Sequence, residues 1–430
     1  MKTAVVVGSG AGGAAVAREL QGRFQVTVLE AGGEFRPFPV SLAAAERIKR
    51  TGLLVDERLI RPLYPAMQIR KTREGLVLVN GVGTGGTTTV STGNALRLDA
   101  GVRAIGVDLD REYAEVAHEV PITAAHERLW REPTRELFRA CAELDLRPRA
   151  MPKMGRYDRC ANCGRCVLGC RYGVKWDARA HLADALQRGA TLLTRHRVER
   201  VVIEGDTATG VVARHCGLRR FFPANLVVLA AGGLATPVIL ERSRLACEPT
   251  LFVDPVLCVA ARLPGARQSR EMPMPFYVEG DGYIISPYFD YLSFFFTRSW
   301  RHPAQDIVSL MIKLADDAVG RVAGTRVDKL LTSADRRRLD EAASLCRRLL
   351  ARIGIRPGDT FLGTLNAGHP GGMLPLTERE AGTLHHDRLP PNLYVADATL
   401  LPRSLGGPPI LTVLALAKRV ARAAAEQVGE

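Results

Sequence analysis

The stretch TAVVVGSGAGGAAVARELQGRFQVTVLEAGG, residues 3–33, constrains the fold of this chain more than any other feature. It reads as an apolar strand over 4–7, a glycine-rich turn, a helix over 14–20 and a second strand over 26–29. In a doubly wound α/β fold, such a strand–helix–strand unit turns its glycine-rich loop toward a dinucleotide. We therefore predict a Rossmann-like domain at this end of the chain.

The glycine-rich turn carries the pattern G-x-G-x-x-G at Gly8, Gly10 and Gly13. Glycines at these places allow a tight turn, close approach of the backbone to a pyrophosphate, and close packing of helix on strand. Glu30 ends the second strand, where a carboxylate can accept hydrogen bonds from an adenosine ribose. An acid there disfavours the 2′-phosphate of NADP, whereas FAD and NAD both fit. A plain glycine-rich turn is the alternative.

Length and charge set wider bounds. A chain of 430 residues suits two domains, and it contains no apolar run of the length that a transmembrane helix needs. The first strand begins almost at once, so we expect a cytoplasmic protein without a signal peptide, with peripheral membrane association as an option. The formal net charge of +14 favours an acidic partner or anionic lipid, since no nucleic-acid-binding motif is present.

A second loop of small residues, GVGTGGTTTVSTGN, follows a strand predicted over 76–79. Small residues let the backbone pass flat against a ligand and donate N–H groups to it. A flexible surface turn is the alternative. We predict a cofactor contact through Gly83, Gly85, Gly86, Thr87 and Asn94.

Four segments resemble the glucose–methanol–choline (GMC) flavoprotein oxidoreductases. They are VVVGSGAGG…VTVLEAGG, GVGTGGTTTVSTGN, VVLAAGGLATPVIL and NLYVADATLLPRSLGGPPILTVLALAKRVA. The resemblance implies FAD, with its adenine near Val198 and its isoalloxazine near the 83–94 loop and the 397–412 segment. It adds Ala231, Gly232, Asp397, Pro409 and Ile410 to the expected cofactor contacts. No histidine lies between residues 70 and 110, so we expect the FAD to be non-covalent.

The fold class that follows is α/β. We expect a three-layer, Rossmann-like FAD-binding domain over 1–250, with cap helices and a cysteine-rich insertion at 150–177. Residues 251–384 are expected to form an α+β substrate domain on an antiparallel sheet, because alternating apolar residues and turn signals fill 251–330. The aromatic stretch YLSFFFTRSW is included in that sheet. Residues 385–430 are expected to return to the first domain.

The catalytic candidates depart from the family pattern. Family members carry a histidine where this chain has NAGHPGGM, which makes His369 the expected acid–base, with Asn366 close before it. They also carry a second histidine or asparagine before the proline of the C-terminal segment. Here Gly406, Gly407 and Pro408 occupy that neighbourhood, and none offers a side chain that handles a proton.

Four clustered cysteines, Cys160, Cys163, Cys166 and Cys170, form C-x₂-C-x₂-C-x₃-C. This spacing is typical of thiolates around a [4Fe–4S] cluster, as in ferredoxins, although Arg171 stands where proline is usual. Cys170 or a remote cysteine would complete the set. Zinc is the main alternative, and cysteines without a metal are a further one. The flanking basic residues would either neutralise the site or dock an acidic electron carrier; they are Lys153, Arg156, Arg159, Arg165, Arg171 and Lys175.

We therefore expect an FAD-dependent dehydrogenase that acts on the CH–OH group of a small, apolar alcohol. Electrons would leave through the iron–sulfur cluster to an acidic carrier or a quinone. The alternatives are a flavin and iron–sulfur reductase of an unsaturated or carbonyl substrate, a non-catalytic electron-transfer subunit, and a zinc-stabilised oxidase.

Overall fold

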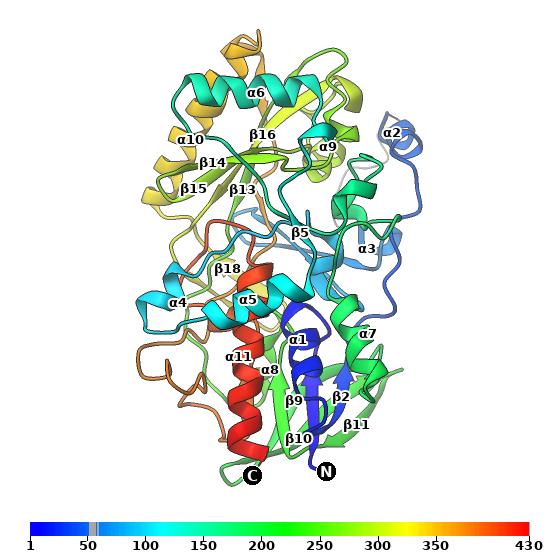
Figure 1. The fold of residues 1–430 in the computed structure, drawn as a ribbon, viewed down its shortest axis with the longest axis vertical. Coiled ribbons are helices and arrows are strands. Elements are labelled where there is room, and N and C mark those ends of the chain that lie inside the picture. The colour runs from blue at the N-terminus through cyan, green and yellow to red at the C-terminus, as the bar shows by residue number, and fades with distance from the viewer. Residues whose placement is uncertain (51–56, 58–59, 430) are drawn as a thin grey trace.

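The computed structural model describes residues 1–50, 57 and 60–429. Two sheets are stacked along the long axis of the molecule, and both chain termini lie at its lower end (Figure 1). The lower sheet is parallel and the upper one is almost entirely antiparallel. These are the two kinds of sheet that the hydrophobic patterns predict.

The lower sheet has the strand order β21-β12-β1-β2-β8, and all four pairs run parallel. Its central strands are buried on both faces, which explains why they are continuous apolar runs in the sequence. The C-terminal strand pairs with β12, so the chain does return to this sheet. The bounds are β1 (Thr3–Val7), β2 (Gln25–Leu29), β8 (Thr191–Leu193), β12 (Leu226–Leu229) and β21 (Leu393–Val395).

Helices cover one face of this sheet and a second, antiparallel sheet lies beyond the other, which gives the predicted three layers. In Figure 1 the C-terminal helix α11 runs beside α1, and the two helices are in contact. The helices on this face are α1 (Ala11–Glu19), α7 (Arg179–Gln187) and α11 (Ile410–Gly429), and α5 (Asp110–Glu119) contacts α11. Helix α8 (Thr236–Arg242) contacts strand β9 of the second sheet instead. The second sheet contains β9 (Arg197–Glu204), β10 (Thr207–His215) and β11 (Leu218–Pro223).

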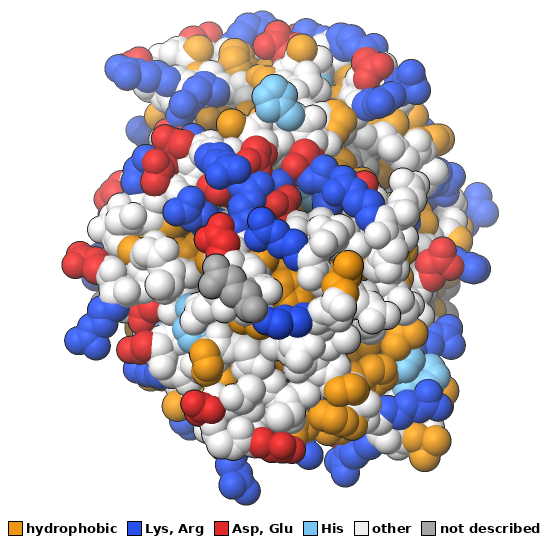
Figure 2. Space-filling view, turned by 60° about the horizontal axis from the view of Figure 1, so that its bottom comes forward, with side chains coloured by type: hydrophobic (Ala, Val, Ile, Leu, Met, Phe, Trp, Pro, Cys, Tyr) orange, Lys and Arg blue, Asp and Glu red, His pale blue; other side chains and the backbone are white. Residues whose placement is uncertain are grey.

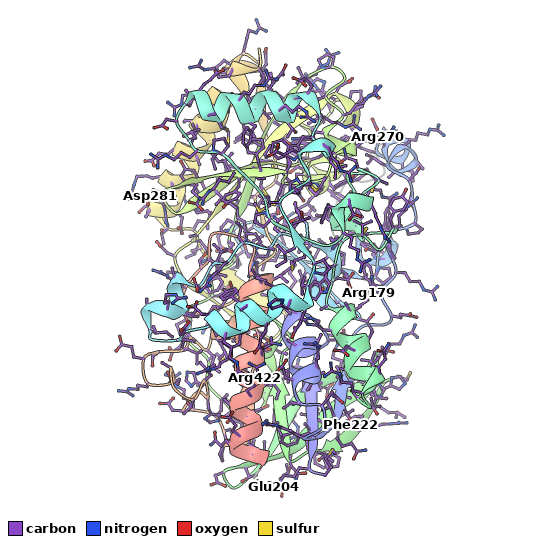
Figure 3. The ribbon with its side chains drawn as sticks, in the orientation of Figure 1. Arg179, Glu204, Phe222, Arg270, Asp281 and Arg422 are labelled. Carbon is purple, nitrogen blue, oxygen red and sulfur yellow. The ribbon has the colours of Figure 1, made fainter. Side chains whose placement is uncertain are left out.

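A buried ion cluster joins α1, α5 and α11. Lys418 on α11 is 1% exposed, and its Nζ lies 2.6 Å from both Glu19 of α1 and Glu119 of α5. Arg422, one turn later on α11 (Figure 3), pairs with Glu19 and Glu115. A buried ammonium group needs acceptors that replace its lost hydration, and here carboxylates of two neighbouring helices supply them, so this cluster fixes how the three helices meet.

The upper sheet contains nine strands, with order β3-β4-β20-β13-β16-β15-β14-β6 and β19 paired to β13. Only the β20–β4 pair within that order is parallel. Helices α6 (Glu132–Glu143) and α10 (Ser333–Arg352) pack on its outer face. The strands are β3 (Met67–Lys71), β4 (Val77–Gly81), β6 (Arg149–Ala150), β13 (Val256–Arg262), β14 (Phe276–Gly280), β15 (Tyr283–Pro287), β16 (Ile307–Leu314), β19 (Thr360–Leu362) and β20 (Asn366–Ala367).

Two features of the upper sheet differ from the sequence prediction. The aromatic segment expected to be a strand forms the short helix α9 (Tyr291–Phe296), because the Asp290 carboxylate accepts from Leu292 N and caps the helix. Strands β3 and β4 belong to the upper sheet although they lie within the predicted first domain. The domain boundaries at 250 and 384 therefore stay predictions.

The smaller elements connect these layers. None of the helices within the described residues has both the length and the apolar character that a membrane crossing requires. On the face in Figure 2, Lys and Arg side chains are spread out and interspersed with acidic ones. The remaining elements include α2 (Leu42–Arg50), α3 (Ile60–Leu63), α4 (Ala100–Ala104), β5 (Ile122–Thr123), β7 (Lys153–Met154), β17 (Gly320–Ala323), β18 (Arg326–Lys329) and the 3₁₀ turns η2 (Gly86–Val90) and η5 (Cys166–Leu168).

Candidate active site

The two glycine-rich loops touch each other at the N-terminus of α1. A Cβ at Gly86 would lie 2.9 Å from the Cα of Gly10, and a Cβ at Gly13 would lie 1.9 Å from Gly8 O. No side chain fits at either place, so glycine is required on both loops. The free N–H groups at the start of α1 face this junction, as a pyrophosphate site requires.

Glu30 links the two loops. One carboxylate oxygen accepts from Ser9 N (3.1 Å) and Ser9 Oγ (2.6 Å), and the other from Gly32 N (2.8 Å) and Gly83 N (3.2 Å). The side chain is buried, and this burial raises its pKa while the hydrogen bonds act in the opposite direction. An acceptor at the end of β2, beside both loops, fits the ribose of a dinucleotide.

Glu30→Arg is expected to weaken FAD binding strongly, because it replaces an acceptor of four hydrogen bonds with a group that only donates. FAD retained after gel filtration measures the effect. Glu34→Arg, at an exposed position four residues later, is the matched control and should keep its FAD. Equal FAD content in the two variants would remove Glu30 from the cofactor site.

The C-terminal turn completes this junction. Asp397 is buried and accepts from Gly232 N (2.8 Å) and Thr236 Oγ1 (2.6 Å). A Cβ at Gly12 would lie 1.7 Å from Ala396 O, which shows how closely α1 packs against the turn. The predicted contacts Ala231, Gly232 and Asp397 therefore meet the start of α1. Val198 is buried on β9. Just before β9, the backbone N–H of His196 donates to the backbone oxygen of Glu30 (2.8 Å).

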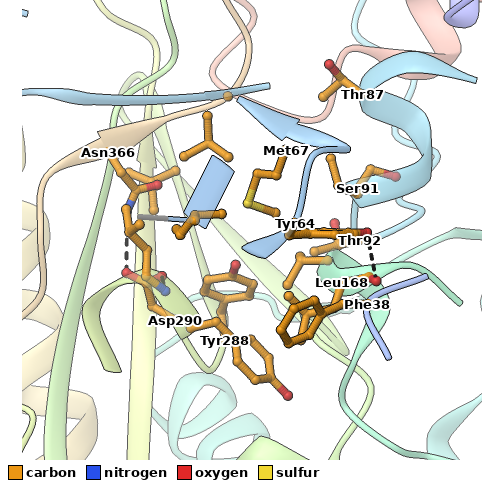
Figure 4. A pocket seen from close by; sticks show the side chains of 18 of the residues that line it. Phe38, Tyr64, Met67, Thr87, Ser91, Thr92, Leu168, Tyr288, Asp290 and Asn366 are labelled. Carbon is orange, nitrogen blue, oxygen red and sulfur yellow. Dashed lines mark hydrogen bonds between the residues drawn. The ribbon is translucent and has the colours of Figure 1, made fainter. Parts of the chain in front are cut away.

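A largely apolar cavity of about 600 Å³ opens between the glycine-rich loop and the upper sheet (Figure 4). Its wall contains predicted cofactor residues together with both catalytic candidates, His369 and Asn366. The aromatic residues of this region fall into two groups. Some line the cavity, whereas Phe289 and Phe294 belong to the hydrophobic core beside it. The cofactor residues in the wall are Thr87, Asn94 and Ile410, and the aromatic ones include Tyr288, Tyr291, Phe295 and Phe296.

His369 lies at a polar corner of the cavity. Its Nδ1 is 3.4 Å from Oδ2 of Asp254, a residue that is itself fully enclosed. Asp254 Oδ1 accepts from Ser404 Oγ and from Gly406 N (3.3 Å), which holds the carboxylate in place. Burial and the nearby Lys313 charge lower the pKa of His369 to about 4, against the opposing effect of Asp254. The imidazole is therefore neutral at pH 7 and able to accept a proton.

Asp254 and Lys313 are site residues that the sequence reasoning missed. Lys313 Nζ lies 3.7 Å from Asp254 Oδ2, so one carboxylate faces both the ammonium and the imidazole. A signal was present, because Lys313 is a lysine inside β16, a strand whose eight residues are all buried. Lysine is almost never buried in such a strand without a role or a partner.

Asn366 lines the same cavity, but its amide is turned toward Asp290. Its Nδ2 donates to Asp290 Oδ2 (3.4 Å, Figure 4) and to Thr364 O (3.0 Å). Burial raises the pKa of Asp290 to about 6. The predicted role of Asn366 beside His369 stays a prediction.

The four clustered cysteines line one small cavity next to the large apolar cavity. All four are free thiols, and the turn η5, which contains Cys166, contacts the glycine-rich loop at η2. Burial raises the pKa of Cys166 to about 12, whereas the charges of Lys175 and Lys153 oppose that rise. Val167 and Leu168, directly after Cys166, line the large apolar cavity itself.

Lys153 and Lys175 do not fit one of the two predicted roles of the basic residues around the cysteines, the docking of an acidic electron carrier. Both are fully enclosed, so they are unavailable to a protein partner. Lys175 Nζ donates to the carbonyls of Thr88, Thr89 and Ser91 at 2.8–3.0 Å. The buried lysines therefore fasten the cysteine segment to the loop expected to contact the cofactor.

Two family models match the chain. The one described as GMC oxidoreductase matches residues 4–251, which is more than half of the chain. The one described as FAD dependent oxidoreductase matches residues 178–423. Together they include both glycine-rich loops, the cysteine run and the C-terminal turn.

Similar proteins include an uncharacterized protein of Methanocaldococcus jannaschii, 25% identical over 430 residues, with 97% of this chain and 98% of that protein covered. An uncharacterized GMC-type oxidoreductase of Mycobacterium tuberculosis is 30% identical over 276 residues, with 61% and 42% covered. A long-chain-alcohol oxidase of Arabidopsis thaliana is 30% identical over 268 residues, with 56% and 34% covered. The chain thus spans less than half the length of the last two.

Among solved structures, the crystal structure of pyridoxine 4-oxidase from Mesorbium loti resembles the whole chain. The TM-score is 0.72 at 17% sequence identity, and 98% of this chain and 99% of that chain are covered. At this identity the likeness concerns the fold. It confirms the predicted α/β architecture, with a cofactor-binding part and a substrate-binding part.

Proposed function

The chain belongs to the GMC oxidoreductase family and is an FAD-dependent oxidoreductase, and from this premise we propose that it dehydrogenates an apolar alcohol. One observation carries the proposal: a neutral histidine, His369, stands at a polar corner of a largely apolar cavity. Such a cavity suits a substrate with one hydroxyl group and a hydrocarbon body. The similarity to a long-chain-alcohol oxidase supports the same substrate class.

Each group of residues around the cavity has a distinct role in this reaction. The glycine-rich loops, Glu30 and Asp397 hold FAD, which when bound supplies the acceptor for hydride. His369 takes the hydroxyl proton, and we assign the acceptor to Nε2 because Nδ1 faces Asp254. Asp254 orients the ring, and the apolar wall keeps water from the reacting atoms.

An anaerobic alcohol panel tests this function. Straight-chain primary alcohols of increasing length should bleach the flavin absorbance, and the efficiency should rise with chain length until the cavity is filled. Each buried CH₂ group contributes about 0.8 kcal/mol, or roughly fourfold in affinity. If only an electron donor such as reduced ferredoxin changes the flavin, the proposal fails in favour of a reductase or an electron-transfer subunit.

We further propose that the cysteine run holds a [4Fe–4S] cluster, which when bound supplies a one-electron carrier. The thiols of all four residues surround one cavity, and buried lysines stand beside it to offset anionic charge. The C-x₂-C-x₂-C-x₃-C spacing of the run is the pattern of thiolates around a ferredoxin cubane, and this spacing favours the cluster over zinc.

The cluster would make the protein a dehydrogenase, with an acidic electron carrier or a quinone as its partner. The cysteine segment is fastened to the predicted flavin loop through Lys175 and lies next to the substrate cavity. Short separation between two redox groups is what electron transfer needs. Arg156, Arg159 and Arg171, on the exposed side of this segment, are available to an acidic carrier.

A further inference from the structure

Lys313 differs from the other buried lysines in its hydrogen bonding. The described part of the chain buries five lysines, and an ammonium group has three donors to satisfy. Four of the five have at least three acceptors, most of them within 3.0 Å. These four are Lys153, Lys175, Lys329 and Lys418.

Among the residues that the structure describes, the fifth, Lys313, has one residue within hydrogen-bonding range. Its Nζ lies 3.4 Å from the backbone oxygen of Asp254 and 3.7 Å from its Oδ2. Both distances exceed the 2.7–3.2 Å that is usual for a strong N–H···O bond, at about 2.9 Å on average. Lys313 is also 3% exposed and lines the substrate cavity. Over residues 1–50, 57 and 60–429 no further acceptor lies in range, so the donor capacity of Lys313 is open to a molecule in the cavity.

We propose that Lys313 donates a hydrogen bond to the substrate oxygen and stabilises the negative charge that develops there as His369 removes the proton. This inference rests on the proposed alcohol dehydrogenation. The O–H bond breaks with its proton going to His369, and the adjacent C–H bond breaks with its hydrogen leaving as hydride, so the alcohol becomes a carbonyl compound. The hydride, which is one hydrogen with two electrons, goes to the FAD on which the activity of the family depends.

The position of Lys313 accounts for the absence of a second proton-handling side chain near Pro408. Gly407 and Pro408 leave that wall without a polar side chain. Lys313 approaches from strand β16 of the upper sheet, and shares Asp254 with His369. The substrate oxygen would then lie between the ammonium and the imidazole, with Asp254 beneath both.

Lys313→Met tests the inference kinetically. Removal of one donor to a developing oxyanion typically costs about 10²–10³ in rate, so anaerobic flavin reduction by the best panel alcohol should slow by that factor. Ile312→Val is the matched control, because it changes the neighbouring residue of β16 on the face that packs against the outer helices. FAD content and thermal midpoint of each variant show whether the fold is kept.

Chemical rescue separates a catalytic role from a structural one. Added methylamine should raise the rate of flavin reduction by Lys313→Ala at least tenfold, because a small ammonium ion can occupy the space that the lysine side chain leaves. A loss of rate without rescue would overturn the inference. So would a Lys313→Met variant that reduces its flavin within threefold of the parent.

Decanoate binding gives a result that does not depend on turnover. Its carboxylate offers anionic oxygens on a hydrocarbon chain, so decanoate should bind the FAD-loaded parent and bind Lys313→Met at least tenfold more weakly. Equal binding by the two proteins, or no binding by the parent, would overturn the role of Lys313. If no alcohol of the panel reduces the flavin while decanoate still binds more weakly to Lys313→Met, the proposed reaction is refuted. The contact between Lys313 and an anionic oxygen would still stand.

Discussion

His369→Ala is expected to slow anaerobic flavin reduction by about 10²–10⁴ while the FAD spectrum stays intact. Loss of a general base typically costs this much in rate, or roughly 3–5 kcal/mol of barrier at 1.36 kcal/mol per decade. The binding of FAD should be unchanged, since the glycine-rich loops and Glu30 lie on other segments. Stopped-flow absorbance of the flavin measures the rate directly.

His118→Ala is the control for this variant, because His118 is exposed on α5 and away from the cavity wall. It should reduce its flavin at the parent rate. A His369→Ala enzyme that stays within threefold of the parent would remove His369 from the mechanism. The reading as a non-catalytic electron-transfer subunit would then be favoured.

The pH dependence of the same step follows from the environment of His369. A base acts only in its neutral form, and burial together with Lys313 lowers the pKa of His369 to about 4. The rate should therefore be flat from pH 8 downward and fall only as the pH approaches 4. A decline centred near the ordinary histidine value of about 6.5 would show that the cavity environment does not lower the pKa of His369.

The fold could be predicted where local pattern and tertiary environment agree. Buried parallel strands are continuous apolar runs, so β1 and β12 are recognisable from the sequence alone. The strand prediction for Tyr291–Phe296 is wrong, because aromatic residues favour strands whereas the capping carboxylate of Asp290 favours a helix. A cap of one residue is a weak signal beside a run of aromatic side chains.

The candidate site could be predicted only in part, because its residues come from distant places in the chain. His369 stands in a recognisable motif, but Asp254 and Lys313 carry no motif of their own. They meet His369 because strand pairing between β13 and β16 sets Val256 opposite Lys313, just after Asp254. Register of this kind is a tertiary property. The lone lysine in an apolar strand was the available clue.

The wall of the cysteine cavity also depends on tertiary structure. Sequence alone places Lys153 and Lys175 beside the cysteines, where both a neutralising and a docking role were open. Burial excludes docking by these two lysines, since a side chain without exposure cannot reach a partner protein, and the neutralising role stays a prediction. Their hydrogen bonds to the 88–94 loop connect the cysteine segment to the loop that is predicted to contact the flavin.

Cys163→Ser is expected to abolish the iron–sulfur cluster while leaving FAD in place. If one cubane is present, the anaerobically prepared parent should hold roughly four irons and four acid-labile sulfides per chain. The variant lacks one of four thiolates, and a hydroxyl is a poor ligand for iron, so both contents should fall sharply. Cys216→Ser, at an exposed cysteine away from the run, is the control and should keep the parent content.

Loss of the cluster should separate the two halves of the reaction. With His369 and the FAD site untouched, alcohol should still reduce the flavin of Cys163→Ser at close to the parent rate. Electron delivery to a one-electron protein acceptor should fall by at least an order of magnitude, because the thiolate-bound relay beside the flavin loop is gone. Stoichiometric zinc without labile sulfide in the parent would refute the cluster, and the cysteine run would then be a structural zinc site in an oxidase that reduces oxygen to hydrogen peroxide.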